Sequence, residues 1–151
     1  MNLQAIKHFC AYQERCHSEV RSKLLELSFR GEALEEAIST LISEGFLNEE
    51  RFARSYTGGK FRILKWGRRK IVQQLKLKQV SEYCIRKGLT EIDEADYYET
   101  LAGLAAQKLH ELRQERSERI RNQKTIRYLV QKGYETGLIL EVLQTKFTEG
   151  E

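Results

Sequence analysis

The sequence has 151 residues, the length of one ordinary domain, and this is enough to bury a hydrophobic core. Hydrophobic residues make up 40% of it and charged residues 32%, a balance typical of folded rather than disordered chains. No stretch approaches the roughly 18 consecutive apolar residues of a membrane-spanning helix, and the opening segment MNLQAIKHFC lacks the apolar region of a secretion signal. Three cysteines, an odd number, suit free thiols in a reducing compartment. We therefore expect a cytoplasmic protein that has no membrane partner.

The formal net charge of +4 is distributed unevenly. Residues 1–50 carry a net charge of −4, and residues 89–151 a net charge of −3. Between them, residues 51–88 contain 12 basic side chains and a single acid, Glu82, for a net charge of +11. Because so dense a block of like charge repels itself, we favour a polyanionic partner over a merely solvated cationic surface.

Apolar residues recur with helical spacing along most of the chain. The spacing i, i+3, i+4, i+7 predicts an amphipathic helix, and the absence of proline removes the strongest helix breaker. No alternating strand pattern extends beyond a few residues. The third part of the chain opens with a long predicted helix over residues 93–112. This helix continues into a basic stretch through Gln114-Glu115-Arg116, which is either helical or a mobile connection. The sequence therefore predicts an all-α fold, its clearest apolar stripe consisting of Leu34, Ala37, Ile38, Leu41 and Ile42.

One pattern for starting a helix occurs twice, 45 residues apart. Residues 47–52 (LNEERF) and 92–97 (IDEADY) both have an apolar residue, a capping Asn or Asp, an acid and, after two variable positions, an aromatic. An Asn or Asp side chain accepts the free N–H groups of a first helical turn, and the apolar residue before it packs on the aromatic. Gly45 and Gly88 precede the two patterns and are predicted to take the left-handed conformation that ends a helix.

Other residues repeat at intervals of 51 and 54 positions. The i, i+4 pairs are Val20/Leu24, Ile71/Leu75 and Thr125/Leu129, and they are followed at a constant distance by Phe29, Val80 and Tyr134. We interpret the chain as three tandem repeats of about 50 residues, each of three helices, with limits at 1–47, 48–92 and 93–151. Because one such repeat buries little surface alone, the repeats are expected to stack into a curved array.

The sequence contains no convincing catalytic or metal-binding motif. Cys16 and His17 are adjacent, but no second Cys/His pair completes a zinc site, and Cys10 and Cys84 are expected to be core residues. The segment Gly58-Gly59-Lys60 lacks the first glycine and the final Ser or Thr of a phosphate-binding loop. No nucleophile, base and oxyanion site occur together, so we expect neither an enzyme nor a metal site.

Three stretches resemble the RecX family of recombination regulators. Residues 11–25 (AYQERCHSEVRSKLL) are similar to the family's first-repeat pattern, and residues 45–56 (GFLNEERFARSY) to its most specific stretch. Residues 60–75 (KFRILKWGRRKIVQQL) resemble the segment in which glycine precedes a basic pair and an Ile-x-x-x-Leu helix. The likeness is strongest over 15–90 and weak beyond 115. Where the family usually has Lys-Gly before position 80, this chain has Lys78-Gln79.

The resemblance implies a curved array of three three-helix repeats that binds a RecA recombinase filament on DNA. It also implies that the protein lodges in the filament groove and modulates or suppresses ATP hydrolysis, strand exchange and filament growth in DNA repair. Since ATP belongs to the recombinase, no cofactor is expected, and nothing demands more than a monomer. Direct contact with nucleic acid is expected to be weak and non-specific.

Charge and resemblance together predict which side chains contact the partner. Aromatic residues interleave with the central cations, and Phe61 and Trp66 suit core packing better than stacking on bases. A sequence-independent DNA-binding protein, with residues 66–88 as a helix-turn-helix, is the alternative. A plain helical adaptor is a further one. The predicted contact residues are Arg51, Arg54, Lys60, Arg62, Lys65, Arg68, Arg69 and Lys70, with Arg116, Arg119, Arg121, Lys124 and Arg127 as a second patch.

Overall fold

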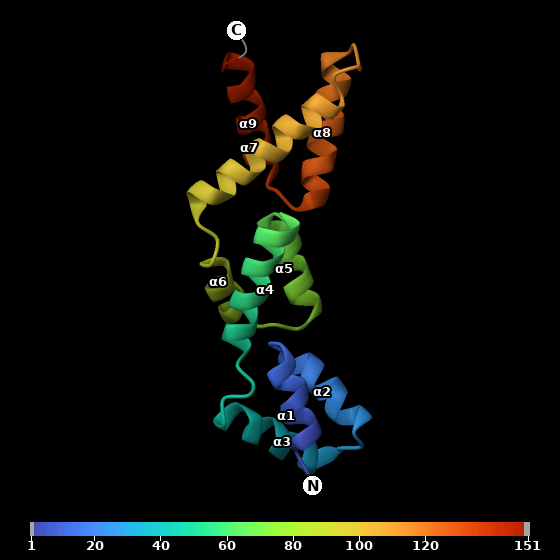
Figure 1. Cartoon of the computed structure of the whole chain (residues 1–151), viewed down its shortest axis with the longest axis vertical. Helices are drawn as coiled ribbons and strands as arrows, with labels where there is room; N and C mark the ends of the chain where they lie inside the picture. Colours follow the sequence, from blue (N-terminus) through green and yellow to red (C-terminus); the bar gives the residue numbers. More distant parts are fainter. Residues whose placement is uncertain (1, 150–151) are drawn as a thin grey trace. The chain divides into compact units, whose positions relative to one another are not determined.

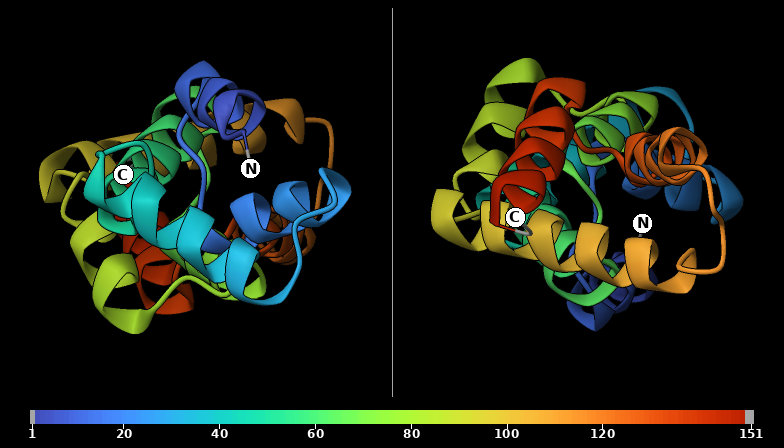
Figure 2. Two further views of the ribbon diagram at one scale, coloured as in Figure 1. Left: turned by 90° about the horizontal axis from the view of Figure 1, so that it is seen from below. Right: turned by 90° about the horizontal axis from the view of Figure 1, so that it is seen from above.

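The computed structural model describes residues 2–149, and all regular structure among them is helical (Figure 2). The predicted all-α fold is therefore confirmed. Residues 114–116 lie in the connection between the seventh and eighth helices and are not helical. In chain order the helices of the described residues are α1 (Gln4–Tyr12), α2 (His17–Glu26), α3 (Gly31–Ser43), α4 (Glu49–Leu64), α5 (Arg68–Leu77), α6 (Glu82–Leu89), α7 (Glu94–Glu111), α8 (Glu118–Lys132) and α9 (Thr136–Glu149) (Figure 1).

The helices form three successive triplets, and this agrees with the predicted three-helix repeats. The predicted capping pattern starts the second and third triplets. The amide of Arg51 donates to the side-chain oxygen of Asn48 at 2.9 Å, and the amide of Asp96 donates to Asp93 at 3.0 Å. The flanking apolar and aromatic residues of both patterns are buried, as a hydrophobic staple requires. The predicted repeat limits remain a prediction.

The second helix of each triplet ends at a residue with a left-handed backbone. These residues are Ser28 with φ 70°, Gln79 with φ 63° and Gly133 with φ 104°. An L side chain resists this conformation, so Ser28 and Gln79 carry a strain that Gly133 avoids. Gln79 stands where the resemblance predicted a glycine, and it takes the left-handed conformation all the same, so α5 still ends at Leu77.

The prediction that Gly45 and Gly88 both end helices is correct for Gly45 and wrong for Gly88. Gly45 follows α3 with φ 80°, as expected, whereas Gly88 is a buried residue inside α6. A Cβ at Gly88 would lie 2.7 Å from the carbonyl oxygen of Ala53 and 3.0 Å from the hydroxyl of Thr57. Gly88 is thus required by the close approach of α6 to α4 rather than by a turn.

The chain divides into two compact units. Unit 1 consists of the residues up to Gly58 and of Gln74–Glu91, and unit 2 of Gly59–Gln73 and the residues from Ile92 onward. Ile6, Val20, Leu24 and Leu41 are fully buried in unit 1. Ile42, which was predicted to belong to the same apolar stripe as Leu41, is instead 47% exposed.

In unit 2 the long helix α7 packs across α8 and α9 (Figure 1). The side chains of Leu101, Leu129 and Ile139, one from each of these helices, are fully buried. Two tyrosines, Tyr97 and Tyr134, are 1% exposed and have ring centroids 5.1 Å apart. This core fixes the segment 64–68, because the Tyr134 hydroxyl donates to the carbonyl oxygen of Lys65 at 2.8 Å.

Candidate nucleic-acid interface

The first two predicted contact residues are held by carboxylates inside unit 1. The Nε of Arg51 lies 2.6 Å from Glu14 Oε1, and its Nη2 donates to the carbonyl oxygen of Gly45 at 3.0 Å. Arg54 lies 3.6 Å from Glu50 and 3.3 Å from Glu91. Both guanidinium groups therefore have counter-charges, and this weakens their attraction for an external anion.

Arg68, at the start of α5, lies within unit 2 between two carboxylates. Its Nε donates to Glu135 at 2.8 Å, its Nη1 donates to Glu94 at 2.6 Å, and the guanidinium lies 4.0 Å from the centroid of the Tyr97 ring. The Tyr97 hydroxyl accepts the Arg68 amide at 2.9 Å and donates to Glu135. Burial, and then the carboxylate of Glu135, raises the pKa of Tyr97 well above its ordinary value. Arg68 thus links the start of α5 to the start of α7 and to Glu135, the residue just before α9.

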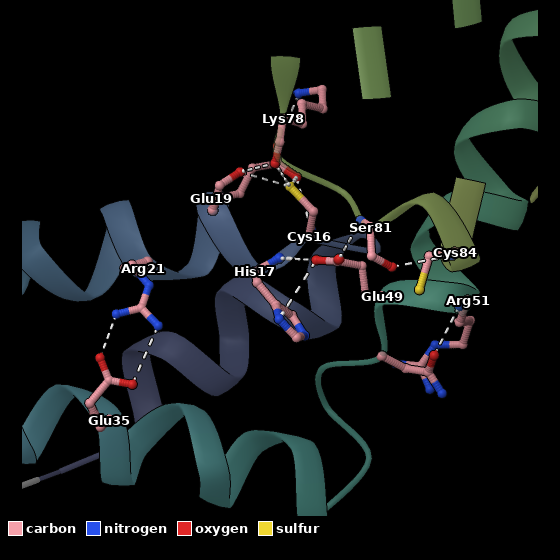
Figure 3. A network of polar contacts seen from close by, with 12 residues as sticks. Cys16, His17, Glu19, Arg21, Glu35, Glu49, Arg51, Lys78, Ser81 and Cys84 are labelled. Carbon is pink, nitrogen blue, oxygen red and sulfur yellow. Dashed lines mark hydrogen bonds and ion pairs between the residues drawn. The ribbon is translucent and has the colours of Figure 1, made fainter. Parts of the chain in front are cut away.

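Arg68 is the first residue of the second helix in its triplet. The equivalent position in the first triplet is His17, the first residue of α2 in unit 1 (Figure 3). Here the amide of His17 donates to Glu49 at 3.1 Å, and the amide of Ser81 donates to the other oxygen of the same carboxylate at 3.3 Å. The Ser18 hydroxyl donates to the Lys78 carbonyl oxygen at 2.7 Å. Cys16 is fully buried beside Glu19, and burial raises the pKa of its thiol. We call the contacts around His17 joint 1 and those around Arg68 joint 2.

Trp66, in the turn between α4 and α5, is flanked by two ammonium groups. Lys60 Nζ lies 5.1 Å, and Lys70 Nζ 4.6 Å, from the centre of its ring system. The turn is closed by the Trp66 amide, which donates to the Lys60 carbonyl oxygen at 3.2 Å, with Lys65 left-handed at φ 58°. Trp66 is only half-buried, whereas Phe61 is 5% exposed and belongs to the core.

Backbone contacts bring Lys132, at the end of α8, to this turn. The amide of Gly67 donates to the Lys132 carbonyl oxygen at 2.8 Å, and the amide of Arg69 donates to that of Gly133 at 2.9 Å. Lys132 Nζ in turn donates to the Leu64 carbonyl oxygen at 2.9 Å. Burial lowers the pKa of Lys132, and the charges of Lys70 and Lys65 lower it further. We call Lys65, Lys70 and Lys132 the lysine triad.

The remaining predicted cations are mostly exposed. Arg62 and Arg69 are exposed, and Arg62 shares a hollow with Lys65, Asp96 and Glu99. In the second patch Arg121 is the exception, since it is half-buried and donates to the Glu115 carbonyl oxygen. Among residues 2–144, no ion pair joins the other members of that patch to an acid. These exposed members are Arg116, Arg119, Lys124 and Arg127.

The structure thus separates the predicted residues into two classes. Arg51, Arg54 and Arg68 are paired with carboxylates and hold the fold together. The exposed members are Arg62, Lys65, Arg69, Arg116, Arg119, Lys124 and Arg127. Sequence reasoning missed Lys132, although Gly67 before a basic pair and Gly133 after Lys132 were signals of a close backbone approach. Within the described part of the chain, no cluster of His, Cys, Asp and Glu suits a metal ion, and no helix there has the length and apolar character to cross a membrane.

Comparisons with known proteins find similarity to one family. Residues 48–89 match the model of the second three-helix domain of RecX, and residues 94–143 match that of the third. The regulatory protein RecX of Clostridium perfringens is 34% identical over 122 residues, which are 80% of this chain and 57% of the relative. That of Pelodictyon phaeoclathratiforme is 32% identical over 123 residues, 80% of this chain and 74% of the relative. The chain therefore spans little more than half the length of the Clostridium perfringens relative.

Two solved structures have the same fold. A crystal structure of regulatory protein RecX superposes with a TM-score of 0.81 at 25% identity and covers 91% of this chain and 67% of that one. The crystal structure of RecX from Lactobacillus salivarius gives a TM-score of 0.85 at 23% identity, covering 93% of this chain and 91% of that one.

Proposed function

Since this chain belongs to the RecX family, as its domain matches and relatives establish, we propose that it is a regulatory protein that binds the RecA filament on DNA. It engages the groove of the filament and thereby inhibits or modulates ATP hydrolysis, strand exchange and filament growth in DNA repair. The observation that carries this proposal is the match of two successive RecX domains over residues 48–89 and 94–143.

The distribution of charge supports a nucleoprotein partner. RecA filaments present DNA phosphates, and a protein that neutralises phosphates needs cations that are not already neutralised by its own acids. Unit 2 offers such cations in two places, the lysine triad and the exposed residues Arg119, Lys124 and Arg127 of α8. An α-helix rises about 1.5 Å per residue, so Arg119 and Lys132 lie about 20 Å apart along α8 and can contact phosphates several nucleotides apart.

A sequence-independent DNA-binding protein is the second candidate. The side chains of Arg119, Lys124 and Arg127 favour it, because they are exposed, form no ion pair with the acids of residues 2–144, and suit phosphates with or without a recombinase. It predicts equal binding to bare DNA and to filaments.

We propose that the protein acts as a monomer in the cytoplasm, without a cofactor or a catalytic activity of its own, because ATP is bound and hydrolysed by the recombinase. We keep 1–47, 48–92 and 93–151 as the limits of the three repeats.

The test is the single-stranded-DNA-dependent ATPase of RecA, measured with increasing amounts of this protein. We expect the ATPase rate to change with the native protein and much less with the triple variant Arg62→Glu, Arg69→Glu, Lys70→Glu. Arg68 is left intact, because reversing it would break joint 2. The double variant Lys76→Glu, Arg86→Glu, at exposed positions outside the predicted contact residues, is the control and should act like the native protein. An ATPase unaffected by the folded native protein contradicts the proposal.

A further inference from the structure

We infer that the lysine triad, Lys65, Lys70 and Lys132, binds the phosphates of a nucleic-acid strand, with Trp66 beside it as a surface for a base. This inference deepens the proposed function and rests on it for its biological setting. Lys132 was not among the contact residues predicted from the sequence.

The triad is assembled from three separate elements of unit 2. Lys65 follows α4, Lys70 lies in the first turn of α5, and Lys132 is the last residue of α8. Their backbones are tied together by the bond from Gly67 to Lys132 and by the bond from the Tyr134 hydroxyl to Lys65. A Cβ at Gly67 would lie 2.3 Å from the carbonyl carbon of Gly133, so only glycine permits this approach. The fold therefore brings the three lysines together, and Lys65 and Lys70 are close enough for their charges to act on Lys132.

No described ion pair neutralises the triad, although Asp96 and Glu99 line the same hollow as Lys65. None of its three ammonium groups has a carboxylate within ion-pair distance among the residues that the structure describes. The nearby Arg68, by contrast, has two carboxylates. The first turn of α5 contains no acid, although the positive end of the helix dipole favours one there. Burial lowers the pKa of Lys132 first, and the charges of Lys70 and Lys65 lower it further; a bound polyanion would relieve this repulsion between the lysines.

The side chains around the triad favour a nucleic acid over an acidic protein. Ammonium groups bind phosphates as point charges. The half-buried ring of Trp66 offers a surface on which a base can stack, and base stacking contributes about 1–3 kcal/mol per base. A nucleic-acid strand places a planar base next to every phosphate, whereas the carboxylates of an acidic protein surface have no such regular planar neighbour.

Trp66 is the single tryptophan of the sequence, so its fluorescence reports on this site directly. The experiment titrates the full chain with oligo(dT), without RecA, at several salt concentrations. We expect the emission of Trp66 to change on binding. The slope of log Kobs against log salt concentration should fall in magnitude by about 0.7 in Lys132→Gln, the value for one phosphate contact on a single strand. Lys70→Gln should lower it similarly. Lys76→Gln, which removes the same charge from an exposed position of α5, should leave it unchanged.

Thermal unfolding confirms that each variant is folded, and glutamine at position 132 keeps a donor for the Leu64 carbonyl oxygen. Equal salt slopes for folded Lys132→Gln and Lys76→Gln overturn the inference. Equally tight, triad-dependent binding of polyglutamate overturns it as well and assigns the triad to an acidic protein. Inorganic phosphate, as a third probe, should bind far more weakly than the oligonucleotide, and phosphate binding of equal strength would indicate a small-anion site instead. The titration contains no RecA, so it tests the inference separately from the ATPase assay. If the protein binds the oligonucleotide in a triad-dependent way but does not change the RecA ATPase, only the proposed function is contradicted.

Discussion

Joint 1 and joint 2 lie at the same position of successive triplets and are held by different chemistry. In joint 1 one carboxylate, Glu49, accepts two backbone amides, and the position before the helix is filled by the buried Cys16 side chain. In joint 2 that position is Gly67. The backbone around it forms hydrogen bonds directly with the backbone of Lys132 and Gly133, and Arg68 forms ion pairs with two carboxylates. The glycine permits an approach that a side chain would prevent, and this approach gathers the lysine triad. Repeats of one fold thus differ in their contacts where one position loses its side chain.

The largest effect is expected for Gly67→Ala, because the new Cβ meets backbone atoms of Gly133 and Tyr134 that cannot move aside. We expect a loss of about 3 kcal/mol or more in the free energy of unfolding, measured by urea denaturation. Gly103→Ala is the matched control, since Gly103 lies inside α7 with open space around it. It should stabilise by about 0.5–1 kcal/mol. Equal stabilities of the two variants would contradict the account of joint 2.

The next effect separates the two joints. Arg68→Gln removes both ion pairs of joint 2 and should cost about 1–3 kcal/mol of unfolding free energy. His17→Gln should cost less than about 0.5 kcal/mol. The His17 side chain is 43% exposed and its Nδ1 lies 3.7 Å from Glu49, while the shorter bond comes from its backbone amide. The measurement is urea denaturation of both variants. A greater loss in His17→Gln would reverse the comparison.

A third effect is the dependence of stability on pH. The pKa of Tyr97 is raised in the folded protein above its ordinary value of 10.0, first by burial. Above that value the unfolded chain loses the tyrosine proton while the folded protein keeps it, so stability falls as pH rises. We expect a loss approaching about 1.4 kcal/mol per pH unit from this residue. Urea denaturation at several alkaline pH values should show a shallower decline for Tyr97→Phe than for the native protein, and parallel declines would contradict this origin.

The smallest effect concerns the close approach in unit 1. The Thr57 hydroxyl is buried and has no hydrogen-bond partner within the described structure, beside Gly88. Thr57→Val keeps the shape and removes the unsatisfied polar group, so it should be neutral or stabilise by up to about 1 kcal/mol. Calorimetry measures the change, and a clear loss of stability would indicate a partner for the hydroxyl.

Local sequence patterns predicted the helices and their starts well. Asn48 and Asp93 cap α4 and α7 because a cap depends only on residues a few positions away. Gly88 was assigned wrongly, because its neighbour across the helix contact, Ala53, is 35 residues away in the sequence and no local pattern announces it.

The candidate site could be predicted only in part. The dense basic block was evident, but which of its cations are neutralised depends on distant acids. Arg68 is paired with Glu94 and Glu135, which lie 26 and 67 positions further along the chain. Lys132 joins the triad through the contact between Gly67 and Gly133, a tertiary contact that charge counting does not detect.

The most direct test of the central claim compares two affinities of the full chain at one salt concentration. One is for single-stranded DNA alone, and the other is for the same DNA covered by RecA in the presence of a non-hydrolysable ATP analogue, both followed by fluorescence anisotropy of the labelled protein. A filament regulator binds the RecA-covered strand at least ten-fold more tightly, a difference of about 1.4 kcal/mol. Equal affinity, or tighter binding to the bare strand, would contradict the claim and leave a DNA-binding protein.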